Sequence, residues 1–324
     1  MIFDKKKIKL YSTIGPRATF GIVMLDLIKN DNNIMVVTAD VSTSAGLDRF
    51  RNQYSNNYID VGISEQNLIN VASGLSTFGY NIFTTTFAPF QTMRCLEQIK
   101  INQGYMKKKI IMVGLASGLV LGTLGYTHCC IEDIGVLRSI PNMTIISPAD
   151  SFELAKALEA SLSHDGPIYV RLTGGPSKNS VYEDDYNFKI GEPTILQEGD
   201  DGVIFSTGSI TSNALLAVRE LKEKYNINYL LVNIHTLKPL DSKVILKYCK
   251  NKKYIATIEE HSIIGGLNSA VSEILAKSNN NHKSYLPIAI NDKYNNSGTY
   301  DFMLDKNGLS KDKLIDTLKK QNNS

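Results

Sequence analysis

The sequence predicts two α/β domains: a first, doubly wound domain with a mostly parallel sheet, and a second, smaller α/β domain. Short apolar runs without alternation of polar residues recur along the chain, as in Asn33 to Ala39. Such runs are typical of strands that are buried on both faces of a parallel sheet. Segments with helical periodicity fill most of the intervals between them, and this alternation indicates a doubly wound fold.

The first domain is expected to span residues 1–177. Residues 17–30 have the apolar spacing of an amphipathic helix, and a second helix is expected at 150–163, after Pro148. Strands are expected at residues 33–39, 58–61, 81–87, 109–114, 143–147 and 167–172.

The pattern breaks at residues 174–192, which contain glycine, proline and acidic residues with little apolar periodicity. This composition indicates an interdomain linker, placed at 178–191. The second domain is then expected at 192–324. Its predicted strands are 203–207, 229–233, 254–259 and 285–290, and its predicted helices are 210–224, 241–251, 266–277 and a closing helix with a polar tail.

Composition limits the function classes. The 324 residues suffice for two domains, and the formal charge of +3 is too small to indicate a nucleic-acid partner. Four cysteines without a CxxC pair favour reduced thiols. The N-terminus lacks the apolar core of a signal peptide, and apolar runs fall short of the roughly 18 residues that a membrane span needs. We therefore expect a cytoplasmic protein without a membrane anchor.

One stretch, residues 58–100, indicates a binding pocket. A short apolar strand leads through Gly62 to Glu65, which begins a helix with apolar residues at three- and four-residue spacing. The next β-rich run ends near two aromatic residues, Phe87 and Phe90. A glutamate in a first helical turn is also explained by the helix dipole alone. Together with two flat rings, however, it is typical of a pocket for a planar heterocycle.

A second candidate is the segment 114–133, which carries glycines at 114, 118, 122 and 125 and then His128. We expect a flexible loop that ends in a histidine suited to proton transfer or hydrogen bonding, although a packing role is equally open. The segment lacks the Gly-Lys-Ser/Thr ending of a P-loop. Of the other histidines, His261 is expected at a glycine-rich helix start or at a domain interface, and His164, His235 and His282 are weaker candidates.

Several segments in register resemble the transketolase family. They read DVGISEQNLINVASGLSTFG, TFAPF, THCCIEDIGVLRSIPNMTIISPAD and EEHSIIGGLNSAVSEIL. The resemblance runs from about Arg17 to the end of the chain. It matches the second half of a full-length transketolase or of a deoxyxylulose-phosphate synthase, and so implies a pyrimidine-binding domain of the thiamine diphosphate type followed by a transketolase-like C-terminal domain.

The resemblance implies cofactor-binding residues. Glu65 matches the glutamate that bonds N1′ of the aminopyrimidine of thiamine diphosphate and activates it by sharing a proton, which requires a carboxylate shielded from water. Phe90 matches the ring that stacks on the aminopyrimidine, and Phe87 lines the same wall. Asp40 and Ile63 fall at further cofactor-binding positions.

The resemblance also implies substrate-binding residues. His128 matches a histidine that faces the sugar and assists proton transfers. Arg17 and Ser44 match positions that bind a sugar phosphate.

Three polar positions of the family are replaced in this chain. The first loop histidine falls at Ala116, the aspartate that reads substrate hydroxyls at Leu124, and a second phosphate-binding arginine at Gly174. Because hydroxyl-reading groups discriminate strongly among substrates, we expect that at least one substrate differs from the usual pentose and hexose phosphates. It is an unusual or carrier-linked sugar.

The sequence lacks a convincing site for the diphosphate and Mg²⁺. The resemblance therefore implies a partner, an N-terminal transketolase-like subunit that carries the diphosphate-binding domain, in an α2β2 heterotetramer. The expected function is transfer of a two-carbon ketol unit from a ketose donor to an aldehyde sugar acceptor. Two alternatives remain: the β subunit of a 2-oxoacid dehydrogenase E1 component, which has the same two-domain plan, and a non-catalytic subunit that stabilises its partner.

Overall fold

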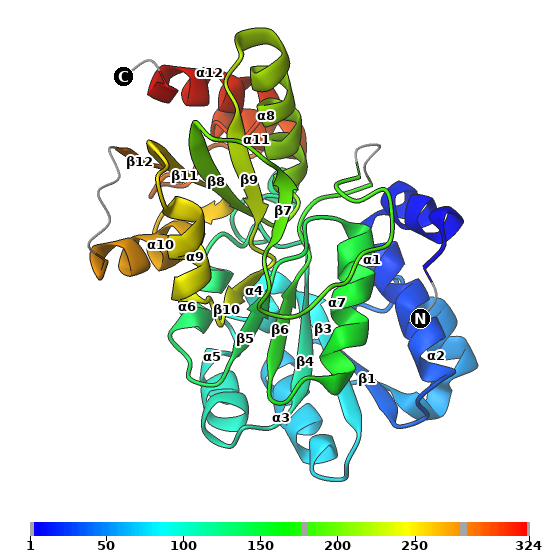
Figure 1. Ribbon diagram of the computed structural model, residues 1–324. Helices are drawn as coiled ribbons and strands as arrows, with labels where there is room; N and C mark the ends of the chain where they lie inside the picture. The colour runs from blue at the N-terminus through cyan, green and yellow to red at the C-terminus, as the bar shows by residue number, and fades with distance from the viewer. Residues whose placement is uncertain (1–2, 177–179, 279–283, 323–324) are drawn as a thin grey trace.

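The computed structural model describes residues 3–176, 180–278 and 284–322. These residues form two sheets, each with helices packed on it (Figure 1). The predicted fold class, a doubly wound and mostly parallel α/β domain followed by a smaller α/β domain, is confirmed. His282 and the expected domain boundary after residue 177 lie outside the described residues.

The first sheet has seven strands in the order β10-β5-β6-β4-β3-β1-β2. The neighbouring strands are parallel except for β10, which is antiparallel to β5 at the edge of the sheet. The strands are β1 (Ile34–Thr38), β2 (Tyr58–Asp60), β3 (Asn81–Phe87), β4 (Ile110–Leu115), β5 (Thr144–Ile146), β6 (Ile168–Arg171) and β10 (Thr236–Lys238).

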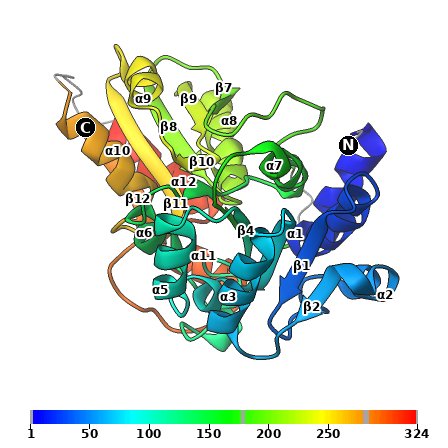
Figure 2. The ribbon, with the colours of Figure 1, turned by 90° about the horizontal axis from the view of Figure 1, so that it is seen from below.

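Helices cover both faces of this sheet, as Figure 2 shows. Val36 packs in one core cluster with residues of α1 and α7, whereas its neighbour Val37 packs in a second cluster with residues of α3, α5 and α6. Successive side chains of a strand point to opposite faces, so an unbroken apolar strand requires this double cover. The helices are α1 (Lys5–Ile28), α2 (Asp48–Gln53), α3 (Glu65–Ser76), α4 (Ala88–Gln91), α5 (Leu96–Ile99), α6 (Asp133–Arg138) and α7 (Ser151–Ser163).

Helix α1 begins twelve residues before the helix expected at residues 17–30. Asp4 caps it by accepting a hydrogen bond from the Lys7 N–H at 2.8 Å. The helix is kinked at Gly15, which has a φ of 79°, and a Cβ there would lie 2.8 Å from the backbone nitrogen of Pro176. Glycine is therefore needed both for the kink and for the contact with the segment between the domains.

The second sheet has five strands in the order β12-β11-β8-β9-β7, with β7 antiparallel to β9 at one edge. Its strands are β7 (Thr194–Gln197), β8 (Gly202–Thr207), β9 (Tyr229–Asn233), β11 (Tyr254–Ser262) and β12 (Ser284–Ile290), and its helices are α8 (Thr211–Tyr225), α9 (Ser242–Cys249), α10 (Leu267–Ala276), α11 (Tyr300–Lys306) and α12 (Lys311–Asn322). Three short turns of other helix types complete the described elements: η1 (Ser55–Asn57), η2 (Lys100–Tyr105) and η3 (Gly122–Leu124).

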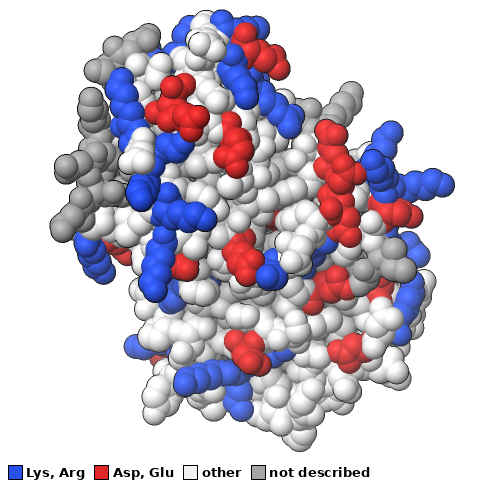
Figure 3. All heavy atoms as spheres, viewed as in Figure 1, with Lys and Arg blue, Asp and Glu red and all other residues white. Residues whose placement is uncertain are grey.

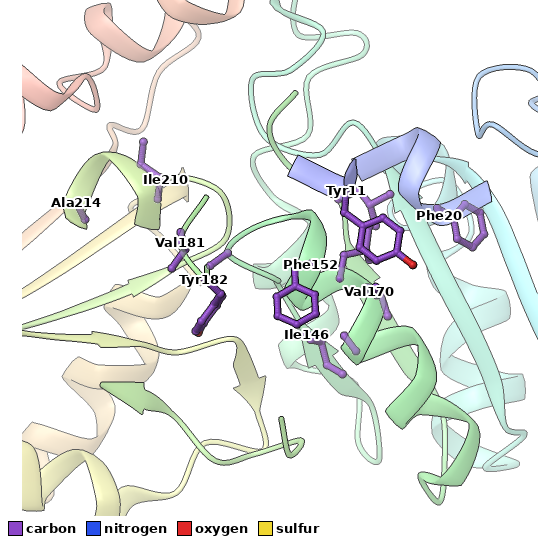
Figure 4. Close-up of a cluster of buried hydrophobic side chains, with 14 of the residues drawn as sticks. Tyr11, Phe20, Ile146, Phe152, Val170, Val181, Tyr182, Ile210 and Ala214 are labelled. Carbon is purple, nitrogen blue, oxygen red and sulfur yellow. The ribbon is translucent and has the colours of Figure 1, made fainter. Parts of the chain in front are cut away.

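The segment between the domains is docked on α7. The Asp150 carboxylate accepts hydrogen bonds from the N–H groups of Val181 and Tyr182, at 2.9 and 3.1 Å. Tyr182 and Tyr186 donate their hydroxyls to the buried carboxylate of Glu153, at 2.9 and 2.7 Å. Val181 and Tyr182 also join a continuous cluster of buried apolar residues (Figure 4). The start of the second domain is thereby fixed to the first.

A buried group of charged and polar side chains joins the two domains. The Nε of Arg171 donates to both carboxylate oxygens of Asp133, at 2.8 and 3.0 Å, and one terminal nitrogen donates to the carbonyl of Glu260 at 2.8 Å. His261, at the end of β11, is fully buried beside them, and its Nε2 accepts the N–H of Gly135 at 3.2 Å. His261 therefore lies at the interface between the two domains, which is one of the two positions expected for it.

The surface carries mixed charge. On the face seen in Figure 3, acidic and basic side chains lie interspersed rather than in a field of one sign. Across the described part of the chain, no helix is both long and apolar enough to cross a bilayer.

Substitution of Arg171 by Met should destabilise the fold by about 3–5 kcal/mol, because it leaves the Asp133 carboxylate buried without its cation. Denaturant unfolding of the whole chain measures the loss. Lys224→Met is the matched control, since Lys224 pairs with Glu220 on the exposed surface of α8. Equal shifts of the unfolding midpoint in the two variants would contradict the account.

His261 should make the fold less stable in acid. Burial lowers the pKa of His261 from 6.5 to about 4, so between these pH values the unfolded chain binds a proton that the folded chain does not. The contribution of His261 to the free energy of unfolding should fall by on the order of 3 kcal/mol as the pH decreases through that window. Glu259, whose pKa burial raises to about 7, acts with the opposite sign. Unfolding of wild type and His261→Gln must therefore be compared pH by pH, and parallel curves would refute the prediction.

Candidate functional site

The expected site residues follow the carboxyl ends of neighbouring parallel strands. Asp40 comes after β1, Glu65 after β2, and Phe87 ends β3, while the segment that carries His128 follows β4. These strands are adjacent in the order β4-β3-β1-β2. Ligands of open α/β sheets bind at this edge, so the topology brings distant segments of the sequence to one place.

Glu65 is the first residue of α3, and its side chain is 6% exposed. Its Oε1 accepts a hydrogen bond from the Nη1 of Arg94 at 2.6 Å. The turn before α3 contains Gly62 in a left-handed conformation with a φ of 70°. The carboxylate is therefore shielded from water, as expected, but it is paired with a cation that the sequence analysis did not identify.

Three rings meet next to this ion pair. Phe90, on α4, lies 6.4 Å from Phe87 and 5.4 Å from the His128 imidazole, measured between ring centroids. Phe87 and His128 are 6.4 Å apart, and all three contacts are edge to face. The structure thus brings together Phe87, Phe90 and His128, which belong to two separate segments of the chain.

Arg94 links the rings to the carboxylate. Its guanidinium carbon lies 4.0 Å from the centroid of Phe90, while its Nη1 bonds Glu65. Arg94 follows Phe90 by four residues, a spacing that places side chains on one side of a helical turn. The four-residue spacing between Phe90 and Arg94 is the sequence signal from which the role of Arg94 could have been predicted.

This arrangement fits a planar heterocycle. The guanidinium is flat, carries N–H donors, and contacts an aromatic face and a shielded carboxylate simultaneously. An aminopyrimidine presents a flat face and ring nitrogens, and would use the same two partners. Arg94 contacts both the Phe90 ring and the Glu65 carboxylate, so it has to release at least one of these two groups before an aminopyrimidine contacts both.

The segment that carries His128, which was expected to be a flexible loop, is closely packed in its first part. Residues 114–119 are all buried, and the Leu119 N–H donates to the Glu260 carboxylate at 2.6 Å. The segment is fixed because it packs against the second domain, which its glycine content alone could not indicate. His128 itself is half-buried, with its Nδ1 2.9 Å from the Thr127 hydroxyl.

Arg17 and Ser44 line one cavity of about 270 Å³, together with Val120 and Gly174. Close backbone contact brings their segments together, since a Cβ on Gly46 would lie 2.9 Å from the carbonyl oxygen of Arg17. Val120 belongs to the segment that carries His128. The same segment therefore borders both the cavity and the aromatic cluster.

The remaining expected positions are more dispersed. Asp40 is exposed and left-handed, and its N–H donates to Asp60 at 3.0 Å. Ile63 is 77% exposed and Leu124 is 56% exposed, whereas Ala116 is buried. Asp40 and Ile63 lie at the same edge of the sheet as Glu65, but within the described residues their own contacts do not join them to the aromatic cluster.

Among the residues that the structure describes, no group of three or more His, Cys, Asp or Glu side chains is arranged to hold a metal ion. The four cysteines, at positions 95, 129, 130 and 249, are buried free thiols.

Comparisons with known proteins identify the family of both domains. The family model for the transketolase pyrimidine binding domain matches residues 12–175, and that for the transketolase C-terminal domain matches residues 191–314. A 6-deoxy-6-sulfo-D-fructose transketolase subunit of Clostridium sp. (strain MSTE9) is 33% identical over 92% of this chain and 92% of its own length. An apulose-4-phosphate transketolase subunit of Phocaeicola vulgatus is 33% identical over 82% and 84%.

A solved structure has the same two-domain arrangement. It is described as a split gene transketolase in an inactive β4 tetramer. The TM-score is 0.86 at 32% identity, over 95% of this chain and 98% of that one.

Substitution of Arg94 should lower the stability of the chain, because Glu65 then remains shielded without a cation. Arg94→Met should destabilise the chain by about 1–2 kcal/mol, because the shielded carboxylate loses its cation. The double variant with Glu65→Gln should recover most of that loss, since neither charge remains. Denaturant unfolding measures both, and Arg94→Lys is the control that keeps the charge. Additive losses in the double variant would show that the two side chains are not coupled.

Proposed function

The chain belongs to the transketolase family, and on this basis we propose that it is the C-terminal subunit of a split transketolase-like enzyme. It transfers a two-carbon ketol unit from a ketose donor to an aldehyde sugar acceptor. The observation that carries the proposal is the meeting of Glu65, Phe90 and His128 at the carboxyl ends of the parallel strands. Both domains of this chain match family models of transketolase domains, and similar proteins of about the same length are named as transketolase subunits.

Thiamine diphosphate, on which the family depends, would supply when bound a nucleophilic carbon that the protein's own side chains lack. Glu65 would hold a proton at N1′ of the aminopyrimidine, and its low exposure would strengthen that hydrogen bond by excluding water. Phe90 and Phe87 would orient the ring by aromatic contact. Asp40 and Ile63, which follow β1 and β2 at the same edge of the sheet, would contact the cofactor outside the aromatic cluster.

His128 moves protons on the substrate. Its Nδ1 is engaged by Thr127, which leaves Nε2 to face the sugar. The ring is held by edge-to-face contacts with Phe87 and Phe90, so the imidazole lies next to the place where the aminopyrimidine would stack. A positioned imidazole of this kind serves as a general acid or base near neutral pH.

Arg17 and Ser44 bind a charged group of the substrate in the cavity that they share. Gly174 lines the same cavity without offering a second guanidinium, and Leu124 offers no hydrogen bond to a hydroxyl. We therefore propose that the substrates include a sugar other than the common pentose and hexose phosphates. The names of two relatives specify a sulfonated ketose and apulose 4-phosphate, which supports an unusual substrate.

A second polypeptide holds the diphosphate and Mg²⁺. This is supported by the lack of a metal-binding group among the described residues, and by the names of two relatives, each of which is one subunit of a transketolase. It also agrees with the description of a similar β4 assembly as inactive. We propose an α2β2 heterotetramer with the cofactor at the interface between the two kinds of chain, located in the cytoplasm, where buried thiols stay reduced.

Turnover should depend on Glu65. In the complex with the N-terminal partner, thiamine diphosphate and Mg²⁺, Glu65→Ala should lower kcat by about 10²–10⁴-fold, because a positioned proton acceptor is lost. Mass spectrometry of products from a panel of phosphorylated, sulfonated and nucleotide-linked sugars supplies the assay and identifies the substrate. Glu97→Ala, an exposed glutamate on α5, is the matched control.

Full turnover of the Glu65→Ala complex would remove Glu65 from the mechanism. A chain that makes its partner more soluble, but adds no turnover with any sugar of the panel, would be a non-catalytic subunit. Release of CO2 from a 2-oxoacid, with acyl transfer to a lipoyl domain, would instead identify the dehydrogenase alternative.

A further inference from the structure

We propose that Glu260, in the second domain, is a positioning residue that holds the segment carrying His128. The second domain would thereby determine where the substrate-facing histidine lies. The inference rests on the proposed role of His128, but its physical content is the attachment of residues 116–130 to the second domain.

Glu260 lies near the end of β11 and is 1% exposed. Its Oε1 accepts the Leu119 N–H at 2.6 Å, and its Oε2 accepts the Tyr300 hydroxyl at 2.7 Å. A buried carboxylate is costly unless such donors satisfy it. One side chain of the second domain thus bonds the backbone of the first domain next to the proposed site.

The approach of the two groups depends on a glycine. Gly118 has a φ of 69°, and a Cβ there would lie 2.2 Å from the Oε1 of Glu260. Gly118 also exchanges two backbone hydrogen bonds with Cys130, at 2.7 and 2.9 Å. The segment is therefore closed at the point that Glu260 contacts, and His128 lies two residues before Cys130.

A second contact covers the outer part of the same segment. The Gly298 N–H donates to the Gly122 carbonyl at 3.1 Å, and the rings of Tyr126 and Tyr294 lie 4.6 Å apart. A Cβ on Gly125 would lie 2.8 Å from the Ser297 hydroxyl. Residues 294–298 of the second domain thus lie against residues 122–126. The glycines expected to make this segment flexible instead permit its close packing.

The neighbouring glutamate offers a matched control. Glu259 is fully buried on the same strand, but its carboxylate accepts the N–H groups of Leu267 and Asn268, at 2.6 and 2.7 Å. Both of these donors belong to α10 of the second domain. Loss of Glu259 should therefore affect the second domain without releasing the His128 segment.

The experiment compares the full-length variants Glu260→Ala, Glu260→Gln and Glu259→Ala. Hydrogen–deuterium exchange follows the amides of residues 116–130. NMR of histidine-labelled protein follows the ring C–H resonance of His128, which the rings of Phe87 and Phe90 shift. The chain has five histidines, and a His128→Gln variant assigns the resonance.

In Glu260→Ala, exchange across residues 116–130 should be faster by on the order of tenfold, because the segment opens locally more often. The His128 resonance should move toward that of an exposed histidine. Glu260→Gln should largely restore both, since its amide oxygen still accepts the Leu119 N–H. Glu259→Ala should leave both close to wild type. An unchanged His128 resonance in Glu260→Ala, or an equal change in Glu259→Ala, would overturn the inference.

Kinetics of the reconstituted complex separate this inference from the proposed function. Glu260→Ala should lower kcat/KM for the ketose by at least about tenfold, while the affinity for thiamine diphosphate is unchanged. If exchange and the His128 resonance respond as expected but the wild-type complex turns over no sugar, the proposed function is wrong and the attachment by Glu260 stands. If wild type is active and Glu260→Ala is equally active, His128 does not depend on Glu260.

Discussion

The buried ion pair between Arg171 and Asp133 is the interaction on which the rest of the structure depends. Arg171 ends β6 of the first sheet and Asp133 begins α6, and neither side chain is more than 1% exposed. The same guanidinium donates to the carbonyl groups of Cys130 and Glu260, at 3.3 and 2.8 Å. It therefore joins the first sheet, the end of the His128 segment and the second domain. A buried pair often gains little net stability over an apolar alternative, and we infer that this one serves to fix a single arrangement of the three parts.

This arrangement explains how one site is assembled from distant segments. The parallel strands bring Glu65, Phe87 and Phe90 to a common edge, and the second domain fixes the segment that places His128 next to them. Arg94 holds the carboxylate and a ring face together in the chain alone. Under the proposed function, the site contacts one end of the cofactor and a partner subunit binds the charged end.

The sequence predicted the fold class well because buried parallel strands are unbroken apolar runs. It missed β7 and β10, which are short edge strands of four and three residues with little pattern of their own. It also missed the first half of α1, which lies before the kink at Gly15. The resemblance to a family identified candidate site residues, but the contact of Leu119 with Glu260 spans 141 positions. Local patterns do not encode such a contact, so a packed segment was expected to be a flexible loop.

We propose that this chain holds only half of a cofactor site. Calorimetric titration of thiamine diphosphate and Mg²⁺ tests it most directly, with the chain alone, its N-terminal partner alone, and the two combined. We expect tight binding to the complex, at least about tenfold weaker binding to either subunit alone, and weaker binding to the complex that carries Phe90→Ala. Equally tight binding to this chain alone would contradict it.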